Sequence, residues 1–315
     1  MGALVELSTG GVARRGGGRG EEVEGAVLAV HGGAGSFRSR SEEGLARATD
    51  GLAASLGAGL AVLSGEGPAV DAVVAAVRVL EDDEEFNAGR GSVLSAGGEV
   101  EMDAAVADGA SGRVGAVGAV SGVRNPVELA RAVLHDRSSV LVVGAAASEL
   151  ATRLGLAAEP PDYFVTERRR REWQGAEGGT VGAVALDTSG NLAAATSTGG
   201  RAGKVPGRIG DSPVPGAGTW ADNATCAVSA TGDGEAFLLS VFAHEVDARV
   251  RLLGAALPEA CRAALAAVER KGGTGGCIAL SPEGRLTMPF TSPGMLRGWV
   301  DGNGFVGLAV FPDAD

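Results

Sequence analysis

The chain has 315 residues, of which 45% are hydrophobic, and its formal net charge is −12 at pH 7. That much apolar sequence can form the core of one large domain or two ordinary ones. The negative charge argues against electrostatic binding to nucleic-acid phosphates or anionic membrane surfaces. We therefore expect a globular protein with neither nucleic acid nor membrane as a partner.

The amino terminus and the cysteines bear on location. The three cysteines, Cys226, Cys261 and Cys277, contain no C-x-x-C pair, so they indicate neither a disulfide framework nor a zinc knuckle. Residues 1–25 have no apolar core of signal-peptide length, and no stretch approaches the roughly 18 continuous apolar residues of a membrane span. We expect a flexible extension over residues 1–25 and a cytoplasmic protein.

The next elements predicted along the chain are a strand, two helices and a meander. The apolar run 26–31 ends in HGGAG and is typical of a buried strand that turns through glycines. Leucines at helical spacing predict a helix between residues 45 and 63, and Pro68 is expected to start a second helix. Three short Val- and Ala-rich segments predict an antiparallel meander, at 92–95, 100–106 and 114–120.

A third predicted helix begins after Asn125, which is expected to cap it. Pro126 takes the first helical position, and Glu128 is placed to close a capping box. A strand at 140–143 and another helix follow. No helix or strand pattern continues over 157–179, and we interpret this stretch as a linker.

Strand patterns resume after this linker. The remaining predicted elements are a hairpin of 181–187 and 191–198, a strand at 223–232, helices at 234–253 and 257–271, and a hairpin of 277–282 and 285–290. Strands therefore fall in two clusters, each with helices beside it. This order favours an α+β architecture in which helices cover two packed sheets.

Several common motifs are absent or lack their context. GNGFVG at 302–307 matches G-x-G-x-x-G, but no helix pattern follows to receive a pyrophosphate. The sequence has neither a Walker motif nor a G-x-S-x-G nucleophile elbow. His31, His135 and His244 lack the spacing of metal ligands, so we interpret them as structural.

The acidic run EDDEE at 81–85 is most simply a solvated helix end. Negative side chains at a helix carboxyl terminus oppose the helix dipole. A bound cation or a tight loop lined by carbonyls would relieve that conflict.

The densest group of polar residues lies at 196–200, 204–213 and 229–235. Within it, Arg208 and Asp211 share a loop framed by glycine and proline. A guanidinium can bind a carboxylate through two hydrogen bonds, and a carboxylate can bind an ammonium, so the pair suits an amino-acid head group. The alternative is a salt bridge between the two residues.

These motifs resemble a known family. HGGAG at 31–35, FNAGRGSVLSAGGEVEMDAAVADG at 86–109, GTVGAVALD at 179–187 and GRIGDSP at 207–213 are similar to the plant-type L-asparaginases, or isoaspartyl peptidases. TSTGG and ATGDGE extend the resemblance, which runs in order from about residue 26 to at least residue 300. The family are N-terminal nucleophile hydrolases of the threonine type. The resemblance implies a four-layer αββα sandwich of two antiparallel sheets flanked by helices, and a homodimer of αβ units.

Such a precursor breaks its own bond between Gly179 and Thr180. The resemblance thus implies a single domain made of an α chain, 26–179, and a β chain, 180–315. Thr180 would then carry both the nucleophilic hydroxyl and a free α-amine, whose unperturbed pKa of about 7.7–8.0 lets it act as the base near neutrality. This would explain catalysis without a cluster of histidines.

The resemblance also implies roles for particular residues. Thr198 would tune the nucleophile, Thr231 and Gly232 would form the oxyanion hole, and Asn87 would reach toward the nucleophile from the α chain. The residues expected to bind substrate are Arg208 for the α-carboxylate, Asp211 for the α-ammonium, and Gly232 and Gly234.

No organic cofactor is expected, but the resemblance implies a structural sodium ion in the loop before and through FNAG. Its expected ligands are the backbone carbonyls of Leu80, Glu81, Asp83, Phe86, Ala88 and Arg90.

The expected activity is hydrolysis of L-asparagine to L-aspartate and ammonia, release of aspartate from β-aspartyl dipeptides, or both. The alternatives are a glycosylasparaginase-like amidase, a taspase-like endopeptidase, and an unprocessed protein that binds an amino acid. The chain departs from the family pattern in a short linker, in Gly203 and Arg90, and in PFTS at 289–292. These departures bear on substrate preference and processing speed more than on reaction type.

Overall fold

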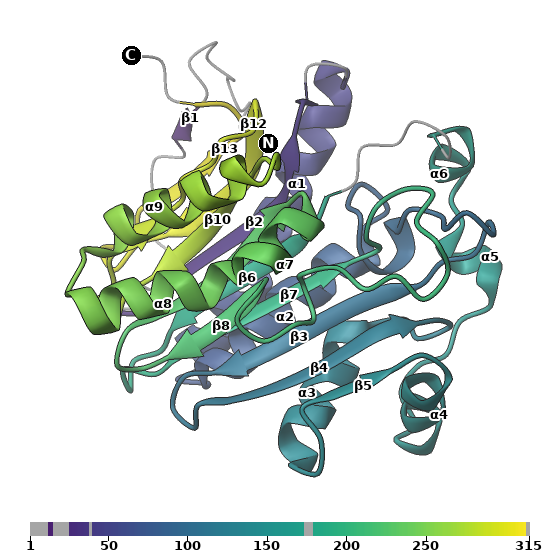
Figure 1. The fold of residues 1–315 in the computed structure, drawn as a ribbon, viewed down its shortest axis with the longest axis horizontal. Coiled ribbons are helices and arrows are strands. Elements are labelled where there is room, and N and C mark those ends of the chain that lie inside the picture. Colours follow the sequence, from purple (N-terminus) through teal and green to yellow (C-terminus); the bar gives the residue numbers. More distant parts are fainter. Residues whose placement is uncertain (1–11, 15–24, 38–39, 173–178, 313–315) are drawn as a thin grey trace.

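The computed structural model describes residues 12–14, 25–37, 40–172 and 179–312. Most strands belong to one large sheet (Figure 1). Its nine members, in spatial order, are β1 (Val12–Arg14), β13 (Val306–Ala309), β12 (Gly294–Val300), β2 (Val27–Gly35), β6 (Val181–Leu186), β7 (Leu192–Thr198), β3 (Met102–Asp108), β4 (Arg113–Val120) and β5 (Leu141–Val143).

A smaller sheet packs against the large one. It contains, in order, β11 (Leu286–Thr287), β10 (Gly275–Leu280), β9 (Cys226–Gly232) and β8 (Thr219–Asp222). The helices beside the large sheet are α1 (Glu42–Ser64), α2 (Ala69–Asp82), α3 (Pro126–Asp136) and α4 (Ala145–Arg153). Those beside the small sheet are α7 (Gly234–Ser240), α8 (Phe242–Leu253) and α9 (Leu257–Arg270).

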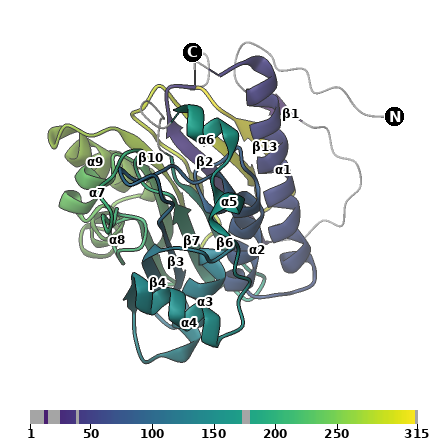
Figure 2. The same ribbon diagram turned by 90° about the vertical axis from the view of Figure 1, so that its right-hand side faces the viewer.

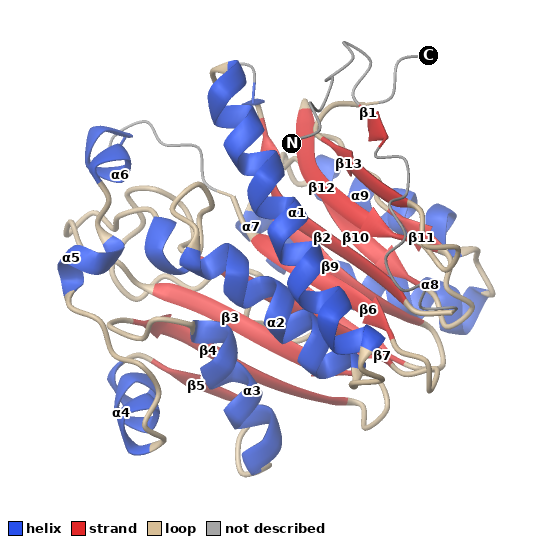
Figure 3. Cartoon of the chain, turned by 180° about the vertical axis from the view of Figure 1, so that it is seen from behind, coloured by secondary structure: helices blue, strands red, loops and turns tan. Residues whose placement is uncertain are grey.

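Three buried apolar clusters separate these layers. The first lies between the large sheet and α1, α2 and α3, and includes Leu28 and Leu80. The second lies between the small sheet and α7, α8 and α9, and includes Phe237. The third lies between the sheets and includes Val184 and Ile278. Two sheets flanked by helices, the predicted architecture, are therefore confirmed, and the views in Figures 2 and 3 show helices on both outer sides.

Strand β6 explains why the run VGAVAL at 181–186 has no polar side chain. Val181, Ala183 and Ala185 face the first cluster, whereas Val184 and Leu186 face the third. A strand buried on both faces needs apolar residues at successive positions rather than alternate ones. Its first residue therefore lies at the boundary between this double core and the polar loops.

Several details differ from the predictions. The sheets were expected to be antiparallel, but β5 runs parallel to β4 at the edge of the large sheet. Segment 92–95 is a loop rather than a strand. The helix predicted over 234–253 is divided into α7 and α8 at Val241, which has a left-handed φ of 45°.

The predicted capping box at α3 is also wrong. Asn125 precedes the helix and Pro126 takes its first turn, but the Asn125 side chain makes no capping hydrogen bond. It donates instead to Asp82 Oδ1 at 3.3 Å. Glu128 pairs with Arg131, 3.0 Å away.

The predicted linker is ordered over its described part. It contains two short helices, α5 (Pro161–Phe164) and α6 (Glu167–Glu172), while 173–178 lie outside the described residues. Within the predicted N-terminal extension, β1 pairs with β13, and the other residues before 25 are not described. Among the described helices, none is long and apolar enough to cross a membrane.

Candidate active site

Thr180 lies immediately before β6 and is buried. Its Oγ1 donates a hydrogen bond to Oγ1 of Thr198, at the end of the adjacent strand β7, across 3.2 Å. Thr198 Oγ1 donates in turn to the carbonyl oxygen of Gly179 at 2.8 Å. Because a hydroxyl has one proton, this second bond leaves Thr198 only its lone pairs for Thr180. The Thr180 hydroxyl is thereby directed at Thr198.

A second donor binds the same carbonyl. Asn87 Nδ2 donates to the Gly179 oxygen at 2.7 Å and to the Gly200 oxygen at 2.8 Å. Its Oδ1 accepts from the Val93 amide at 2.8 Å, which orients the side chain. The Gly179 carbonyl is therefore polarised by two fixed donors. In the sequence, Asn87 precedes the predicted cleavage site and Thr198 follows it.

Thr231 and Gly232 are the last two residues of strand β9, in the small sheet. Thr231 Oγ1 accepts from the Ala34 amide at 3.2 Å, so its hydroxyl proton is available to another acceptor. Gly232 has a φ of +147°, and a Cβ there would lie 2.3 Å from the Thr274 carbonyl oxygen. Only glycine can bring this backbone amide to the site.

The guanidinium of Arg208 pairs with a residue that the sequence interpretation did not include. Its Nε and Nη2 donate to the two carboxylate oxygens of Glu235, at 3.0 and 2.7 Å. The predicted alternative, an Arg208–Asp211 salt bridge, is wrong, because the ion pair of Arg208 is with Glu235. Glu235 binds two guanidinium nitrogens, Nε and Nη2, and Nη1 takes no part in this pair. Glu235 directly follows ATGDG, so its place in that motif was the available signal.

Asp211 is buried, and its Oδ2 has no hydrogen-bond partner among the described residues. Burial raises the pKa of this carboxyl to about 7. A Cβ at Gly234 would lie 2.9 Å from both Arg208 Nη2 and Asp211 Oδ1, so glycine is needed between them. The Asp211 carboxylate thus offers an unused acceptor that suits a small cation.

One cavity of about 300 Å³ joins these groups. Its lining includes the predicted residues Gly179, Thr180, Thr198, Arg208, Asp211, Gly232 and Gly234, together with Glu235, Ser36, Thr274 and Ser292. The nucleophile Thr180, the Gly232 backbone and the head-group residues Arg208 and Asp211 therefore line a single space. Thr231, which precedes Gly232 in the chain, is fully buried and does not line it. Asn87 does not line it but holds its Gly179 wall.

His31 has the structural surroundings predicted for it. It is fully buried, and its Nε2 lies 2.9 Å from Ser229 Oγ. Burial lowers the pKa of His31 to about 3, so the ring is neutral. The network continues through Thr196 Oγ1, 2.7 Å from Ser229, to Thr219 Oγ1.

The loop that follows α2 is lined by carbonyls. A Cβ added at Gly89 would lie 2.2 Å from the Glu81 oxygen, and one at Gly91 would lie 2.0 Å from the Phe86 oxygen. Gly89 also has a left-handed φ of +51°. The close turns through η2 (Gly89–Gly91) thus require glycine.

Of the other expected ligand positions, Asp83, Ala88 and Arg90 lie in this loop, whereas Leu80 is near the end of α2. Asp83 O accepts from the Phe86 amide at 3.2 Å, and Ala88 O from the Gly91 amide at 3.1 Å. Leu80 is in the apolar core, and the Arg90 guanidinium lies over the ring of Tyr163, 5.6 Å from its centroid. Within the described residues, no three His, Cys, Asp or Glu side chains could hold a metal ion together.

The acidic run was predicted to be solvated, which is wrong for two of its members. Glu81 is fully buried and accepts from Ser197 Oγ at 2.6 Å and from the Val127 amide at 3.0 Å. Burial raises the pKa of Glu81 to about 8. Glu85 is also buried, among arginines.

Comparison with known proteins finds relatives over most of the chain. A family model described as asparaginase matches residues 24–178 and 175–308. The chain is 42% identical over 296 residues to an isoaspartyl peptidase of Salmonella typhimurium, which covers 87% of this chain and 95% of that protein. It is 43% identical over 290 residues to a plant-type L-asparaginase of Pyrobaculum calidifontis, covering 87% and 96%. An isoaspartyl peptidase/L-asparaginase of Mus musculus is 42% identical over 283 residues, covering 85% and 86%.

Proposed function

Because the chain belongs to this asparaginase family, we propose that it is a self-cleaving threonine amidohydrolase that acts on L-asparagine, on β-aspartyl dipeptides, or on both. The observation that carries the proposal is the placement of the Thr180 hydroxyl beside Thr198, with the Gly179 carbonyl held by Thr198 and Asn87. A nucleophile adjacent to a polarised carbonyl is the requirement for acyl transfer.

Self-cleavage begins when Thr180 Oγ attacks the carbonyl carbon of Gly179. The bond from that carbon to the Thr180 nitrogen breaks, so the acyl group moves to the hydroxyl and the α-amine becomes free. Water then hydrolyses the ester and releases the Gly179 carboxylate. Asn87 and Thr198 stabilise the negative charge that develops on the Gly179 oxygen, where one positioned donor can contribute roughly 2.7–4 kcal/mol.

Turnover uses the same hydroxyl with the new amine as its base. Thr180 Oγ attacks the side-chain amide carbon of asparagine, or the isopeptide carbon of a β-aspartyl dipeptide, and gives up its proton to the amine. Ammonia or an amino acid leaves, and water hydrolyses the acyl-enzyme to aspartate. The Thr231 hydroxyl and the Gly232 amide stabilise the oxyanion.

Substrate orientation comes from the other end of the cavity. Asp211 binds the α-ammonium through its unpartnered oxygen, and Gly234 leaves room for it. Arg208 binds the α-carboxylate while Glu235 fixes its guanidinium. Both candidate substrates present this same aspartyl group, so the site accepts either.

The finer features of the family are part of this proposal. The two sheets and their helices are compatible with the αββα fold of N-terminal nucleophile hydrolases, and we assign the chain to that fold as a homodimer of αβ units in the cytoplasm. The carbonyl-lined turns at 80–90 suit a sodium ion, a hard cation that prefers oxygen ligands. When bound, it would stabilise the loop and take no part in the chemistry.

Intact mass spectrometry under denaturing conditions tests the proposal first. We expect two chains, one ending at Gly179 and one beginning at Thr180. The processed enzyme should release aspartate from asparagine and β-aspartyl-leucine, but not from α-aspartyl-leucine. A single 31.1 kDa chain that binds aspartate without turnover would support the unprocessed binding protein instead. Preference for glycosylated asparagine would support a glycosylasparaginase.

A further inference from the structure

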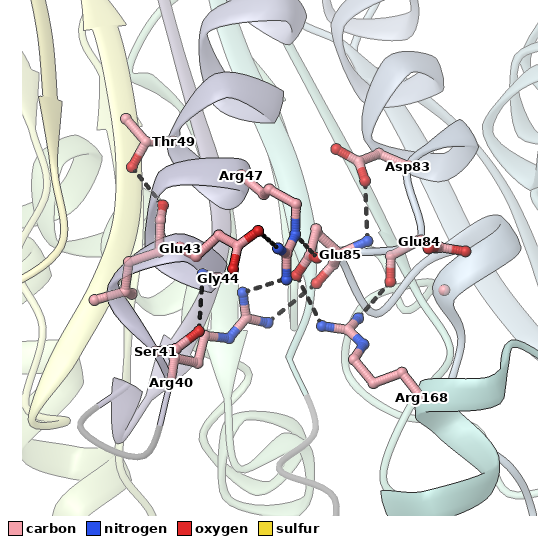
Figure 4. Close-up of polar contacts among 12 residues, drawn as sticks. Arg40, Ser41, Glu43, Gly44, Arg47, Thr49, Asp83, Glu84, Glu85 and Arg168 are labelled. Carbon is pink, nitrogen blue, oxygen red and sulfur yellow. Dashed lines mark hydrogen bonds and ion pairs between the residues drawn. The ribbon is translucent and has the colours of Figure 1, made fainter. Parts of the chain in front are cut away.

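Helix α6 lies against both ends of the loop formed by residues 84–91. Arg168 Nη2 donates to the carbonyl oxygen of Glu84, and its Nη1 lies 2.9 Å from Glu85 Oε2 (Figure 4). Arg169 is buried, and its Nε donates to the carbonyl oxygen of Gly91 at 2.6 Å. Two consecutive arginines therefore bind the two ends of one loop.

The middle of that loop holds the predicted cleavage site. Asn87 donates from its side chain to the Gly179 carbonyl and accepts at its own carbonyl from the Gly199 amide, 2.9 Å away. Asn87 thus lies between the points that Arg168 and Arg169 hold. A displacement of either loop end would shift its amide relative to Gly179.

Glu85 joins α6 to the start of α1. Its carboxylate is approached by Arg47 Nε at 2.7 Å, by Arg168 Nη1 at 2.9 Å and by Arg40 Nη1 at 3.5 Å (Figure 4). Burial alone would raise the pKa of Glu85, but the hydrogen bond from Arg47 and the charges of Arg168 and Arg40 lower it. The carboxylate therefore stays ionised near neutrality, and hydrogen bonds between charged partners are stronger than neutral ones.

The four consecutive arginines of α6 have different surroundings. Arg170 and Arg171 are 56% and 76% exposed, and they pair only with Asp162 and Glu167 among the described residues. Asp162 belongs to α5 and Glu167 to α6, so neither is part of loop 84–91. Arg170 and Arg171 thus have the same chemistry and helix as Arg168 and Arg169 but no contact with the loop.

On the basis of the proposed self-cleavage, we infer that Arg168 and Arg169 are positioning residues for Asn87. By holding both ends of loop 84–91, they keep the Asn87 amide on the scissile carbonyl, so the rate of self-cleavage depends on α6. These contacts involve no atom of the bond that breaks. We therefore expect helix α6 to stay bound to the loop in the processed enzyme.

Cell-free synthesis followed by a chase on denaturing gels would measure the cleavage rate directly. We expect Arg168→Ala/Arg169→Ala to cleave roughly 10–100-fold more slowly, because a displacement of about 1 Å can cost up to 100-fold in rate. Arg170→Ala/Arg171→Ala should cleave at the wild-type rate. Arg168→Lys/Arg169→Lys should recover part of the rate, since lysine keeps the charge but not the fork. KM of the processed double-alanine variant should be unchanged, because Arg208 and Asp211 do not contact α6.

Equal cleavage rates in the two double-alanine variants would overturn the inference. Hydrogen exchange on Thr180→Ala chains gives a readout that needs no cleavage. Amides of 84–93 should exchange faster with Arg168→Ala/Arg169→Ala than with Arg170→Ala/Arg171→Ala, and equal exchange would overturn the contact by itself. A wild-type chain that never cleaves would overturn the proposed function and the processing role together, whatever the exchange result.

Discussion

Arg208 and Glu235 form a two-point ion pair at the mouth of the candidate active site, with Nε and Nη2 of the guanidinium on the two carboxylate oxygens. An arginine held in this way keeps a fixed orientation, while its Nη1 takes no part in the pair. Arg208 also lines the cavity, so the same side chain can bind a substrate carboxylate there. Lysine has a single ammonium and cannot meet both demands. Orientation by Glu235 is therefore part of how this site would recognise a carboxylate.

We predict that Arg208→Lys raises KM for asparagine about 10–100-fold and lowers kcat much less. The reason is that a charged hydrogen bond to the ground-state substrate contributes about 1.5–3 kcal/mol. Steady-state kinetics on fully processed enzyme would measure both constants. An unchanged KM would show that the α-carboxylate binds elsewhere.

The pH dependence should report Asp211. Its raised pKa of about 7 means that the carboxyl gains a proton as pH falls through that value, and a neutral acid binds an ammonium poorly. The α-amine of Thr180 must also lose its proton over a nearby range. We therefore expect log kcat/KM to fall with a slope near two on the acid side.

Asp211→Asn removes one of these two ionisations. The acid limb should then fall with a slope near one, and KM should rise because the amide carries no charge. Comparison of the two profiles with β-aspartyl-leucine checks this expectation. A slope that does not change between wild type and variant would contradict the role of Asp211 in the pH profile.

The nucleophile can be tested by substitution. Thr180→Ala should abolish both self-cleavage and turnover, since no other hydroxyl takes its place before β6. Thr180→Ser keeps an oxygen and an α-amine, so it should cleave and retain measurable activity. Mass spectrometry and an ammonia assay measure the two outcomes, and a Thr180→Ala protein that still splits and hydrolyses asparagine would refute the mechanism.

Asn87→Ala should slow self-cleavage by about 100-fold, because it removes one of two donors to the developing oxyanion. Thr198→Ser is the matched control, since it keeps the other donor hydroxyl and should cleave within a few-fold of wild type. A chase after cell-free synthesis measures both rates. Equal rates for the two variants would mean that the Asn87 hydrogen bond does not stabilise the transition state.

Two glycine substitutions should have opposite effects on stability. A Cβ at Gly89 would lie 2.2 Å from the Glu81 carbonyl oxygen, and its φ is left-handed, so Gly89→Ala should destabilise the fold by more than about 1 kcal/mol. Gly57 lies in α1 with nothing within 4 Å of an added Cβ. Gly57→Ala should stabilise by about 0.5–1 kcal/mol. Denaturant unfolding of Thr180→Ala chains measures both without the complication of cleavage.

The sequence by itself was enough for the architecture and for most residues of the candidate site. Apolar runs and turn residues predicted two strand clusters with helices, because burial on both faces of strands such as β6 leaves a continuous apolar signal. Motif likeness predicted Thr180, Thr198, Arg208 and Asp211 as site residues, and the structure places all four around one cavity. A local sequence pattern or a direct resemblance is sufficient to predict features of this kind.

Only the tertiary structure decided which charged side chains pair with each other. Glu235 binds the guanidinium of Arg208 from 27 residues away in the sequence. Glu85 pairs with arginines from two helices. Arg168 and Arg169 bind a loop more than 70 residues earlier in the chain. In the sequence, the acidic run looks like solvated charge and the arginine run falls in the predicted linker. Long flexible side chains pair with whatever opposite charge lies near them in the folded chain, which the sequence does not give. Burial makes such pairing necessary, because a desolvated charge without a partner is energetically costly.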